Sequence, residues 1–240
     1  IIANKYNLAA VKMEVQRSTP PTPGFLEGVR DLCSRRGIVL IFDECTSGFR
    51  ETFGGLHLKY GVDPDMAMFG KALGNGYAIT AIIGRSEVME AAQNTFISST
   101  FWTERIGSTA ALKALEVMER ERSWEIITSR GLELRNRWQQ LADRHGIRIA
   151  HNGLPALCGF AFQSDKALEY KTLISQEMLK KGYLAATSCY VSLSHTSEVI
   201  ESYCNAMESI FSLIAECESG RSIHDLLEGP VCHGGFNRLN

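Results

Sequence analysis

The first third of the chain alternates short apolar runs with one amphipathic stretch. Residues 8–15 (LAAVKMEV) predict a strand, and the apolar positions from Phe25 to Cys33 fall on one face of a helix. Thr22, with Pro23 after it, is the expected start of that helix, and Gly37 is its expected end. The apolar run at residues 38–42 (IVLIF) is typical of a strand that is buried on both faces of a parallel sheet. This order of elements indicates a β-α-β unit with a right-handed crossover.

The pattern continues with two more short strands, and longer helices dominate after them. Strands are predicted at residues 65–69 and 78–84, on either side of a glycine-rich segment. Helices are predicted at residues 86–92, 104–120, 124–145, 165–181 and from a Thr196 cap to about Cys217, and strand-like segments at residues 147–150, 157–163 and 183–193. We therefore predict an α/β fold, with a mainly parallel sheet over residues 1–122 and a small α+β domain over residues 123–240.

The composition is that of an ordinary globular chain, and it narrows the function classes. Hydrophobic residues make up 45% and charged residues 22%, which argues against disorder. The net charge of −2 leaves no basic excess for a nucleic-acid partner, and no stretch has the ~18 apolar residues of a membrane span. The seven cysteines form no C-x-x-C pair. They indicate reduced thiols in a cytoplasmic protein, and we expect no metal site.

Two ionisable residues follow predicted strands of the parallel sheet. Asp43 comes directly after the apolar run IVLIF, and Lys71 follows the strand that ends at Phe69. Ligands bind outside the carboxyl ends of such strands, so a carboxylate and an amine are expected over one crevice. Gly70, Gly74 and Gly76 surround the lysine and allow a ligand to approach the backbone closely. A lone lysine or aspartate would more simply be a surface residue, but the glycines favour a site.

This pair matches the needs of pyridoxal phosphate. A lysine amine forms a Schiff base with the aldehyde of that cofactor, and a carboxylate keeps its ring nitrogen protonated. A competing interpretation is the magnesium-binding strand of an ATPase, because Asp43 and Glu44 end an apolar run. That fold also needs a G-x-x-x-x-G-K-[ST] loop, which these residues lack. An ATP-hydrolysing or non-catalytic module therefore stays a distant alternative.

Three further candidates favour structural roles. His57 has no acidic partner at the spacing of a catalytic triad, and His195 directly precedes the Thr196 cap. Glu14 ends a strand near the expected crevice, where a supporting role is more common than a catalytic one.

The motifs resemble a known enzyme family. The segments IFDECTSGFRETFGG, FGKALGNGY and TFISSTFWTERIG are similar to those of class III pyridoxal-phosphate aminotransferases of fold type I. The C-terminal segment LEGPVCHGGFNRL resembles the branch that includes glutamate-1-semialdehyde aminomutase. The resemblance covers essentially the whole chain, and it implies an enzyme that transfers an amino group between an amino donor and a carbonyl acceptor.

The resemblance also implies roles for individual residues. Lys71 matches the Schiff-base lysine, and Asp43 matches the partner of the ring nitrogen. Cys45 stands where the family usually has a valine packed on the ring, and Thr46 stands where many members have a glutamine near the phenolic oxygen. Thr100 matches a threonine that reaches the cofactor phosphate of the partner subunit, so a homodimer with a shared active site is expected.

The resemblance has two further consequences, one for family elements that these residues lack and one for segments that differ from the aminomutases. In this family the main phosphate cradle and the ring-stacking aromatic residue come from the N-terminal half. We therefore expect this chain to be a later part of a larger protein, or to be complemented by another chain. Residues 45–47, 72–76 and 101–105 depart from the aminomutases, notably through the bulky Phe101 and Trp102. These departures favour an intermolecular aminotransferase, with glutamate-1-semialdehyde 2,1-aminomutase as the alternative.

Overall fold

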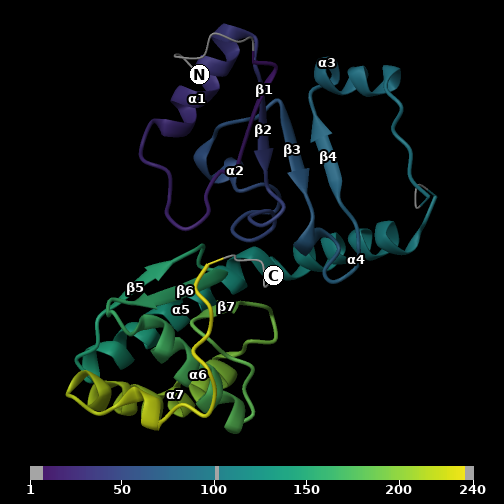
Figure 1. Ribbon diagram of the computed structural model, residues 1–240. Helices are drawn as coiled ribbons and strands as arrows, with labels where there is room; N and C mark the ends of the chain where they lie inside the picture. The colour runs from purple at the N-terminus through teal and green to yellow at the C-terminus, as the bar shows by residue number, and fades with distance from the viewer. Residues whose placement is uncertain (1–7, 101–102, 236–240) are drawn as a thin grey trace. The chain divides into compact units, whose positions relative to one another are not determined.

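The computed structural model describes residues 8–100 and 103–235, and its chain divides into two compact units, residues 1–126 and 127–240. The first unit is built on a four-stranded sheet in the order β1-β2-β3-β4 (Figure 1). The strands are β1 (Ala10–Met13), β2 (Val39–Asp43), β3 (Met66–Phe69) and β4 (Ala81–Gly84). The first three are parallel neighbours, and β4 runs antiparallel to β3. The prediction of a mainly parallel sheet is confirmed, and the reversed β4 makes the sheet mixed.

Short helices connect these strands. The first unit contains α1 (Phe25–Arg36), α2 (His57–Tyr60), the 3-10 turn η1 (Lys71–Leu73), α3 (Ser86–Met89), the 3-10 turn η2 (Glu90–Asn94) and α4 (Ile106–Glu121). Helix α1 packs against β2 and buries Leu26 and Cys33, so the predicted β-α-β unit is present. Strand β2 is buried on one face only, through Leu40 and Phe42, whereas the continuous apolar run predicted burial on both faces.

The C-terminal end of α1 was predicted correctly, and its N-terminal end was not. Gly37 ends the helix in the left-handed conformation (φ 64°), as expected, and its N–H reaches the carbonyl of Cys33. The predicted start at Thr22 is wrong. Gly24, at φ 80°, is the N-cap, and the Thr22 carbonyl accepts from the N–H of Phe25 at 3.1 Å. The threonine therefore takes part in a turn through its backbone, and glycine supplies the left-handed step into the helix.

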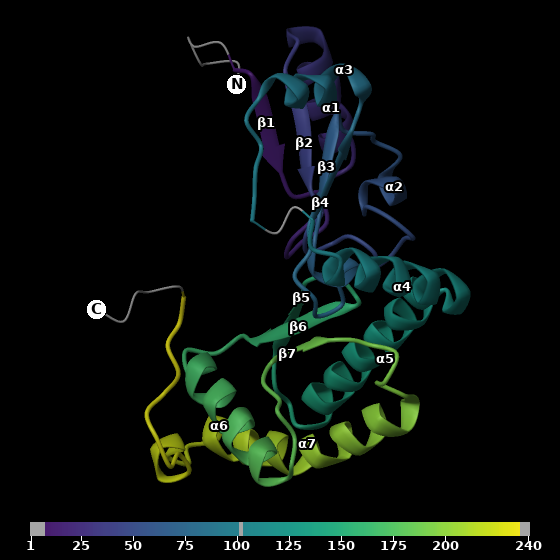
Figure 2. The same cartoon turned by 90° about the vertical axis from the view of Figure 1, so that its right-hand side faces the viewer.

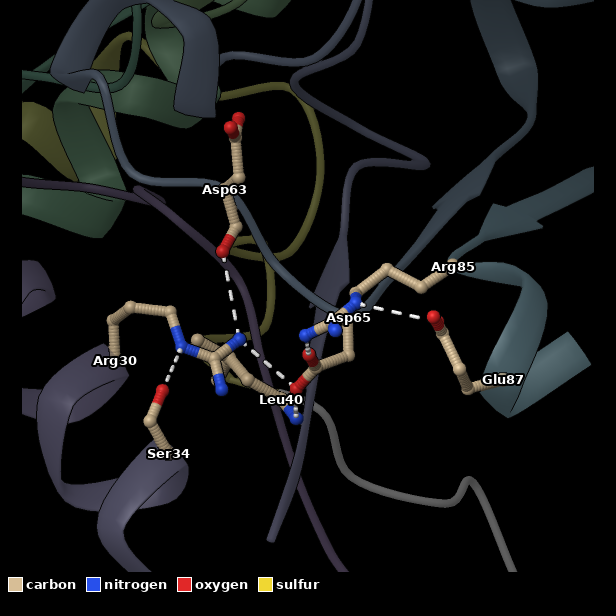
Figure 3. A network of polar contacts seen from close by, with 7 residues as sticks. All are labelled: Arg30, Ser34, Leu40, Asp63, Asp65, Arg85 and Glu87. Atoms are coloured by element: carbon tan, nitrogen blue, oxygen red, sulfur yellow. Dashed lines mark hydrogen bonds and ion pairs between the residues drawn. The ribbon is translucent and has the colours of Figure 1, made fainter. Parts of the chain in front are cut away.

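Asp65 ties four elements together at the start of β3 (Figure 3). Its carboxylate accepts from the N–H of Leu40 at 2.8 Å, from Arg30 of α1 at 2.9 Å and from Arg85 after β4 at 3.2 Å. Burial acts to raise the pKa of Asp65, but the Leu40 N–H and the Arg30 guanidinium hold it below its usual value. This network fixes the register of β2, β3 and β4 at the sheet end opposite to Asp43 and Lys71.

The second unit is a small α+β domain. Its antiparallel sheet has the order β5-β6-β7, and Figure 2 shows α6 and α7 on the same side of these strands. The elements are α5 (Ser123–Arg144), β5 (Ile149–Asn152), β6 (Leu157–Phe162), α6 (Ala167–Lys180), β7 (Ser188–Tyr190), α7 (Ser197–Glu218) and the 3-10 turn η3 (Ile223–Asp225). The tilted rings of Trp138 and Phe160 pack in the core with their centroids 4.9 Å apart, and the predicted Thr196 cap accepts from the N–H of Val199.

The identities given to the two units, a later part of a cofactor-binding domain and a small C-terminal domain, stay predictions. Within residues 8–100 and 103–235, none of the helices combines the length and apolar character that crossing a membrane requires.

Candidate active site

Asp43 and Lys71 lie at the ends of two neighbouring strands. Asp43 is the last residue of β2, and Lys71 opens η1 just after β3. The two strands are parallel, with Asp43 opposite Met68, so their carboxyl ends meet at one edge of the sheet. Open α/β sheets bind their ligands at this edge. The structure thus places the carboxylate and the amine as the sequence suggested, while their chemical roles stay predictions.

Lys71 holds a backbone conformation that lysine rarely adopts. Its φ of 44° lies in the left-handed region, which costs a non-glycine residue on the order of 1–3 kcal/mol. The packing of η1 maintains it, because Ala72 and Leu73 are buried and Leu73 joins Ala111 of α4 in one apolar cluster. Strained backbone of this kind concentrates at ligand and active sites. Phe49, Asn75 and Arg122 also have positive φ, so Lys71 is distinguished by combining this conformation with a position at a strand end beside Asp43.

The turn after Lys71 is tight enough to require glycine. A Cβ added at Gly74 would lie 2.1 Å from the carbonyl oxygen of Tyr77, far inside contact distance. The Tyr77 N–H donates to the Gly74 carbonyl at 3.1 Å, and the Asn75 N–H donates to the Lys71 carbonyl at 3.0 Å. The glycine-rich segment therefore closes on itself and presents the lysine at the strand end.

The loop after β2 meets the lysine. The ammonium of Lys71 donates to the hydroxyl of Thr46 at 2.9 Å. Cys45 lies beside Gly70, where an added Cβ would be 3.5 Å from the cysteine sulfur. Burial raises the pKa of the Cys45 thiol, and the Asp43 carboxylate adds to this rise. Four of the five predicted site residues, Asp43, Cys45, Thr46 and Lys71, thus lie in one cluster.

Asp43 has a partner that the sequence analysis missed. Lys12, on β1, places its ammonium 2.9 Å from Oδ2 of Asp43. The other carboxylate oxygen, Oδ1, accepts from the N–H of Cys45 at 3.1 Å. The Lys12 ammonium and the Cys45 N–H hold the pKa of Asp43 below its usual range. The signal that could have revealed Lys12 is that it is the only charged residue among residues 8–13 (LAAVKM) of the predicted strand.

A buried acid closes the loop that carries Cys45 and Thr46. Glu44 is fully buried, and its carboxylate accepts from the hydroxyl of Ser47 and from the backbone N–H of His57. The same carboxylate lies 2.9 Å from Nδ1 of His57. The sequence analysis found no acidic partner for His57 at the spacing of a catalytic triad, and loop closure brings Glu44 to it from 13 residues away. Burial acts to raise the pKa of Glu44, but the donors of His57 and Ser47 lower it.

Thr100 is the predicted site residue that the structure does not bring to this cluster. It is exposed, and no hydrogen bond joins it to Asp43 or Lys71. Figure 1 shows the stretch that follows α3 and η2, residues 95–100, on the far side of β4 from β2. Phe101 and Trp102, the bulky residues among the departures from the aminomutases, lie outside the described residues.

Two other candidates have local partners. His195 accepts from the N–H of Ser192 at 3.0 Å through Nδ1, and the carboxylate of Glu14 lies 3.8 Å from Nε of Arg17. These contacts agree with structural roles for both. Glu104, just before α4, accepts from the N–H groups of Ile106 and Gly107 through its carboxylate.

The donor set of the cluster fits pyridoxal phosphate. A primary amine on Lys71 matches the aldehyde carbon of that cofactor. A carboxylate with a lowered pKa on Asp43 matches a ring nitrogen that has to stay protonated. The chain therefore contains, at the ends of adjacent strands, an amine for the aldehyde of this cofactor and a carboxylate for its ring nitrogen.

Comparison with known sequences connects this site with a family. The family described as Aminotransferase class-III matches residues 7–211. The 3-aminobutyryl-CoA aminotransferase of Cloacimonas acidaminovorans is 39% identical over 154 residues, which are 64% of this chain and 37% of that protein. The glutamate-1-semialdehyde 2,1-aminomutase of Natranaerobius thermophilus is 30% identical over 238 residues, which are 90% of this chain and 55% of that protein. The chain thus spans about a third to a half of these curated relatives.

Solved structures share the fold. The FumI protein of Sphingopyxis sp. MTA144, solved in its PLP internal aldimine form, matches with a TM-score of 0.81 at 22% identity, over 91% of this chain and 55% of that one. An omega-transaminase from Sphaerobacter thermophilus matches with a TM-score of 0.74 at 22% identity, over 86% of this chain and 52% of that one. These likenesses confirm the predicted fold type I architecture.

Proposed function

The chain belongs to the class III aminotransferases, and from this premise we propose that it carries the lysine and aspartate of a pyridoxal-phosphate-dependent aminotransferase. One observation supports the proposal most strongly. Lys71 stands in a left-handed conformation at the end of β3, beside the end of β2 that carries Asp43. The full protein would move an amino group from an amino donor to a carbonyl acceptor.

Each residue of the cluster has a part in this proposal. When bound, pyridoxal phosphate supplies an aldehyde that condenses with amines and a protonated ring that withdraws electrons. Lys71 would hold the cofactor through Nζ and, once displaced by the amino donor, would move a proton from and back to the substrate as base and acid. Thr46 holds the amine of Lys71, and Asp43 would hold the proton of the ring nitrogen.

A reduction experiment tests the role of Lys71. Borohydride treatment of the complete protein with pyridoxal phosphate is expected to attach a pyridoxyl group to Lys71, identified by peptide mass spectrometry. The variant Lys71→Ala should lose this label, and the variant Lys59→Ala, a lysine of the same unit paired with Glu51, should keep it. A label on Lys12, the second lysine near Asp43, or no label at all would refute the assignment.

We also propose that the reaction is intermolecular transfer and not the aminomutase reaction. The departures at residues 45–47, 72–76 and 101–105 support this choice, because they alter the surroundings of the cofactor and of the phosphate threonine. The complete enzyme, given an amino donor alone, should release a keto product and accumulate pyridoxamine phosphate. Failure with a broad panel of donors, together with conversion of glutamate-1-semialdehyde to 5-aminolevulinate, would establish the aminomutase instead.

The assembly and the location of the protein are further parts of the proposal. We infer a homodimer in which Thr100 reaches the cofactor phosphate of the partner subunit, as the family resemblance implies. The scattered cysteines of the sequence support a cytoplasmic location, and small molecules are the proposed substrates.

A further inference from the structure

Lys12 interrupts an apolar strand at the point where it faces the site. Strand β1 pairs in parallel with β2, and Lys12 lies opposite Ile41. Because side chains alternate along a strand, Ile41 and Asp43 share one face of the sheet, and Lys12 is on that face too. The ammonium of Lys12 lies 2.9 Å from Oδ2 of Asp43. The strand register, and not a flexible loop, therefore delivers a second lysine to the aspartate.

The two lysines of the site have different partners. Lys71 donates to Thr46, whereas Lys12 binds Asp43. The carboxylate of Asp43 is held at both oxygens, since Oδ1 accepts from the N–H of Cys45. Each carboxylate oxygen has two lone pairs, so Asp43 is able to accept one more donor without releasing Lys12.

The charges around Asp43 come from three elements. Lys12 on β1 is in direct contact with it, and Glu14, just after β1, acts on Lys12. Cys45, on the loop after β2, has a pKa that is raised by burial, and Lys71 after β3 acts on that thiol. Among the described residues around the carboxylate, Lys12 is thus the cation in contact with it.

We propose that Lys12 is a positioning residue, which orients Asp43 toward the ring nitrogen of the cofactor and, by its charge, makes that nitrogen lose its proton at lower pH. The proposal rests on the proposed function. Two physical effects act in the same direction. Lys12 partly neutralises the Asp43 carboxylate, whose negative charge would otherwise stabilise the protonated ring. The ammonium of Lys12 also places a second positive charge near the protonated ring. The pH at which the ring nitrogen loses its proton would then depend on Lys12 of β1.

The first test uses the protein without cofactor. The carboxyl group of Asp43 is followed by ¹³C NMR in protein labelled at the aspartate carboxyl carbon, and the signal is assigned with Asp43→Asn. Lys12→Met removes the charge and keeps most of the side-chain length, so the titration midpoint of Asp43 should rise toward its ordinary value. Lys12→Arg should keep it low. An unchanged midpoint in Lys12→Met would show that the ion pair has no influence in solution, and the proposal would fail.

The second test uses the complete protein loaded with pyridoxal phosphate that is ¹⁵N-labelled at the ring. In Lys12→Met the midpoint for loss of the ring proton should rise by about one pH unit relative to wild type. Lys12→Arg should behave as wild type, and Lys12→Gln replaces Lys12→Met if that variant does not fold. Lys59→Met, which removes a lysine paired with Glu51 in the same unit, is the matched control and should leave the midpoint unchanged.

The outcomes separate this inference from the function on which it rests. A ring midpoint that is equal in wild type and Lys12→Met would overturn the role of Lys12, even if Asp43 itself responds. Absence of any bound cofactor would refute the proposed function, while the titration of Asp43 without cofactor would still report on the ion pair. A purely structural role of Lys12 would change the unfolding midpoint and the titration of Asp43, but it would leave the titration of the ring nitrogen unchanged.

Discussion

At the scale of single residues, Glu44 shows how the loop beside the site is held. The side chain has no solvent exposure (0%), and it remains an acceptor for Ser47 and for two nitrogens of His57. Buried carboxylates are tolerated when donors satisfy them, and removing the acceptor leaves those donors without a partner. Cys45 and Thr46 precede Ser47 on this loop, so Glu44 helps to fix their positions.

We expect Glu44→Gln to destabilise the protein by about 2 kcal/mol at neutral pH, because buried donors lose a charged acceptor. The pKa of Glu44 is lowered on folding, so its contribution to stability is present above its ordinary value of 4.5 and is lost as the pH falls through the folded value. The difference between the urea unfolding midpoints of wild type and Glu44→Gln should therefore shrink on acidification. Glu87→Gln, a change at an exposed ion pair, is the control and should differ little at any pH. A constant difference across the acid range would contradict this account.

The sequence was sufficient to place Asp43 and Lys71 at the ends of neighbouring strands, because both follow short apolar runs typical of strands. It was insufficient for Lys12, whose contact with Asp43 depends on the register of β1 against β2. It was also insufficient for the contact of Glu44 with His57, which depends on how the loop between them closes. Local patterns identify strand ends, whereas contacts across strands and loops follow from tertiary packing.

At the scale of elements, the turn that follows β3 controls how Lys71 is presented. Gly74→Ala should weaken retention of pyridoxal phosphate by about tenfold, because the new methyl group would lie against the Tyr77 carbonyl and shift the lysine. Equilibrium dialysis of the complete protein with the cofactor measures this. Gly28→Ala on α1 is the matched control, since a Cβ there meets nothing within 4 Å, and it should leave binding unchanged. Equal cofactor binding in wild type and Gly74→Ala would show that the turn does not position Lys71.

The predicted elements differ from the structure in the direction of one strand and in the residue at which one helix begins. Apolar periodicity identified β4 but carries no information on its direction, and it proved antiparallel to β3. Side-chain capping preferences placed the start of α1 at Thr22, whereas the left-handed Gly24 determines it. By contrast, the Gly37 and Thr196 caps were predicted correctly, because each depends on one residue and its immediate neighbours.

At the scale of the whole molecule, several large apolar side chains of the first unit are exposed. Ile82 and Ile83 are exposed on β4, which ends the described sheet, and Leu112 is 71% exposed on α4. Phe96, between η2 and α4, is 97% exposed. Exposed apolar side chains and an open sheet edge are features of surfaces that bind other chains. They support the proposed homodimer, in which the segment that carries Thr100 would meet the partner subunit.

Phe96 is the residue at which this assembly is best tested. Aromatic anchors at interfaces contribute about 2 kcal/mol or more, so Phe96→Ala should raise the dimer dissociation constant of the complete protein by about 30-fold. The exposed side chain makes few contacts within its own chain, so the change should leave folding intact. Sedimentation over a dilution series measures the constant, and Leu179→Ala, at a 60% exposed apolar residue of α6, is the control that should leave it unchanged.

A wild-type protein that is monomeric at micromolar concentration with its cofactor bound would contradict the shared active site, because Thr100 would then have no partner subunit to reach. An equal effect of Leu179→Ala would instead show that any loss of apolar surface weakens the dimer, and that the segment before α4 has no special place in it.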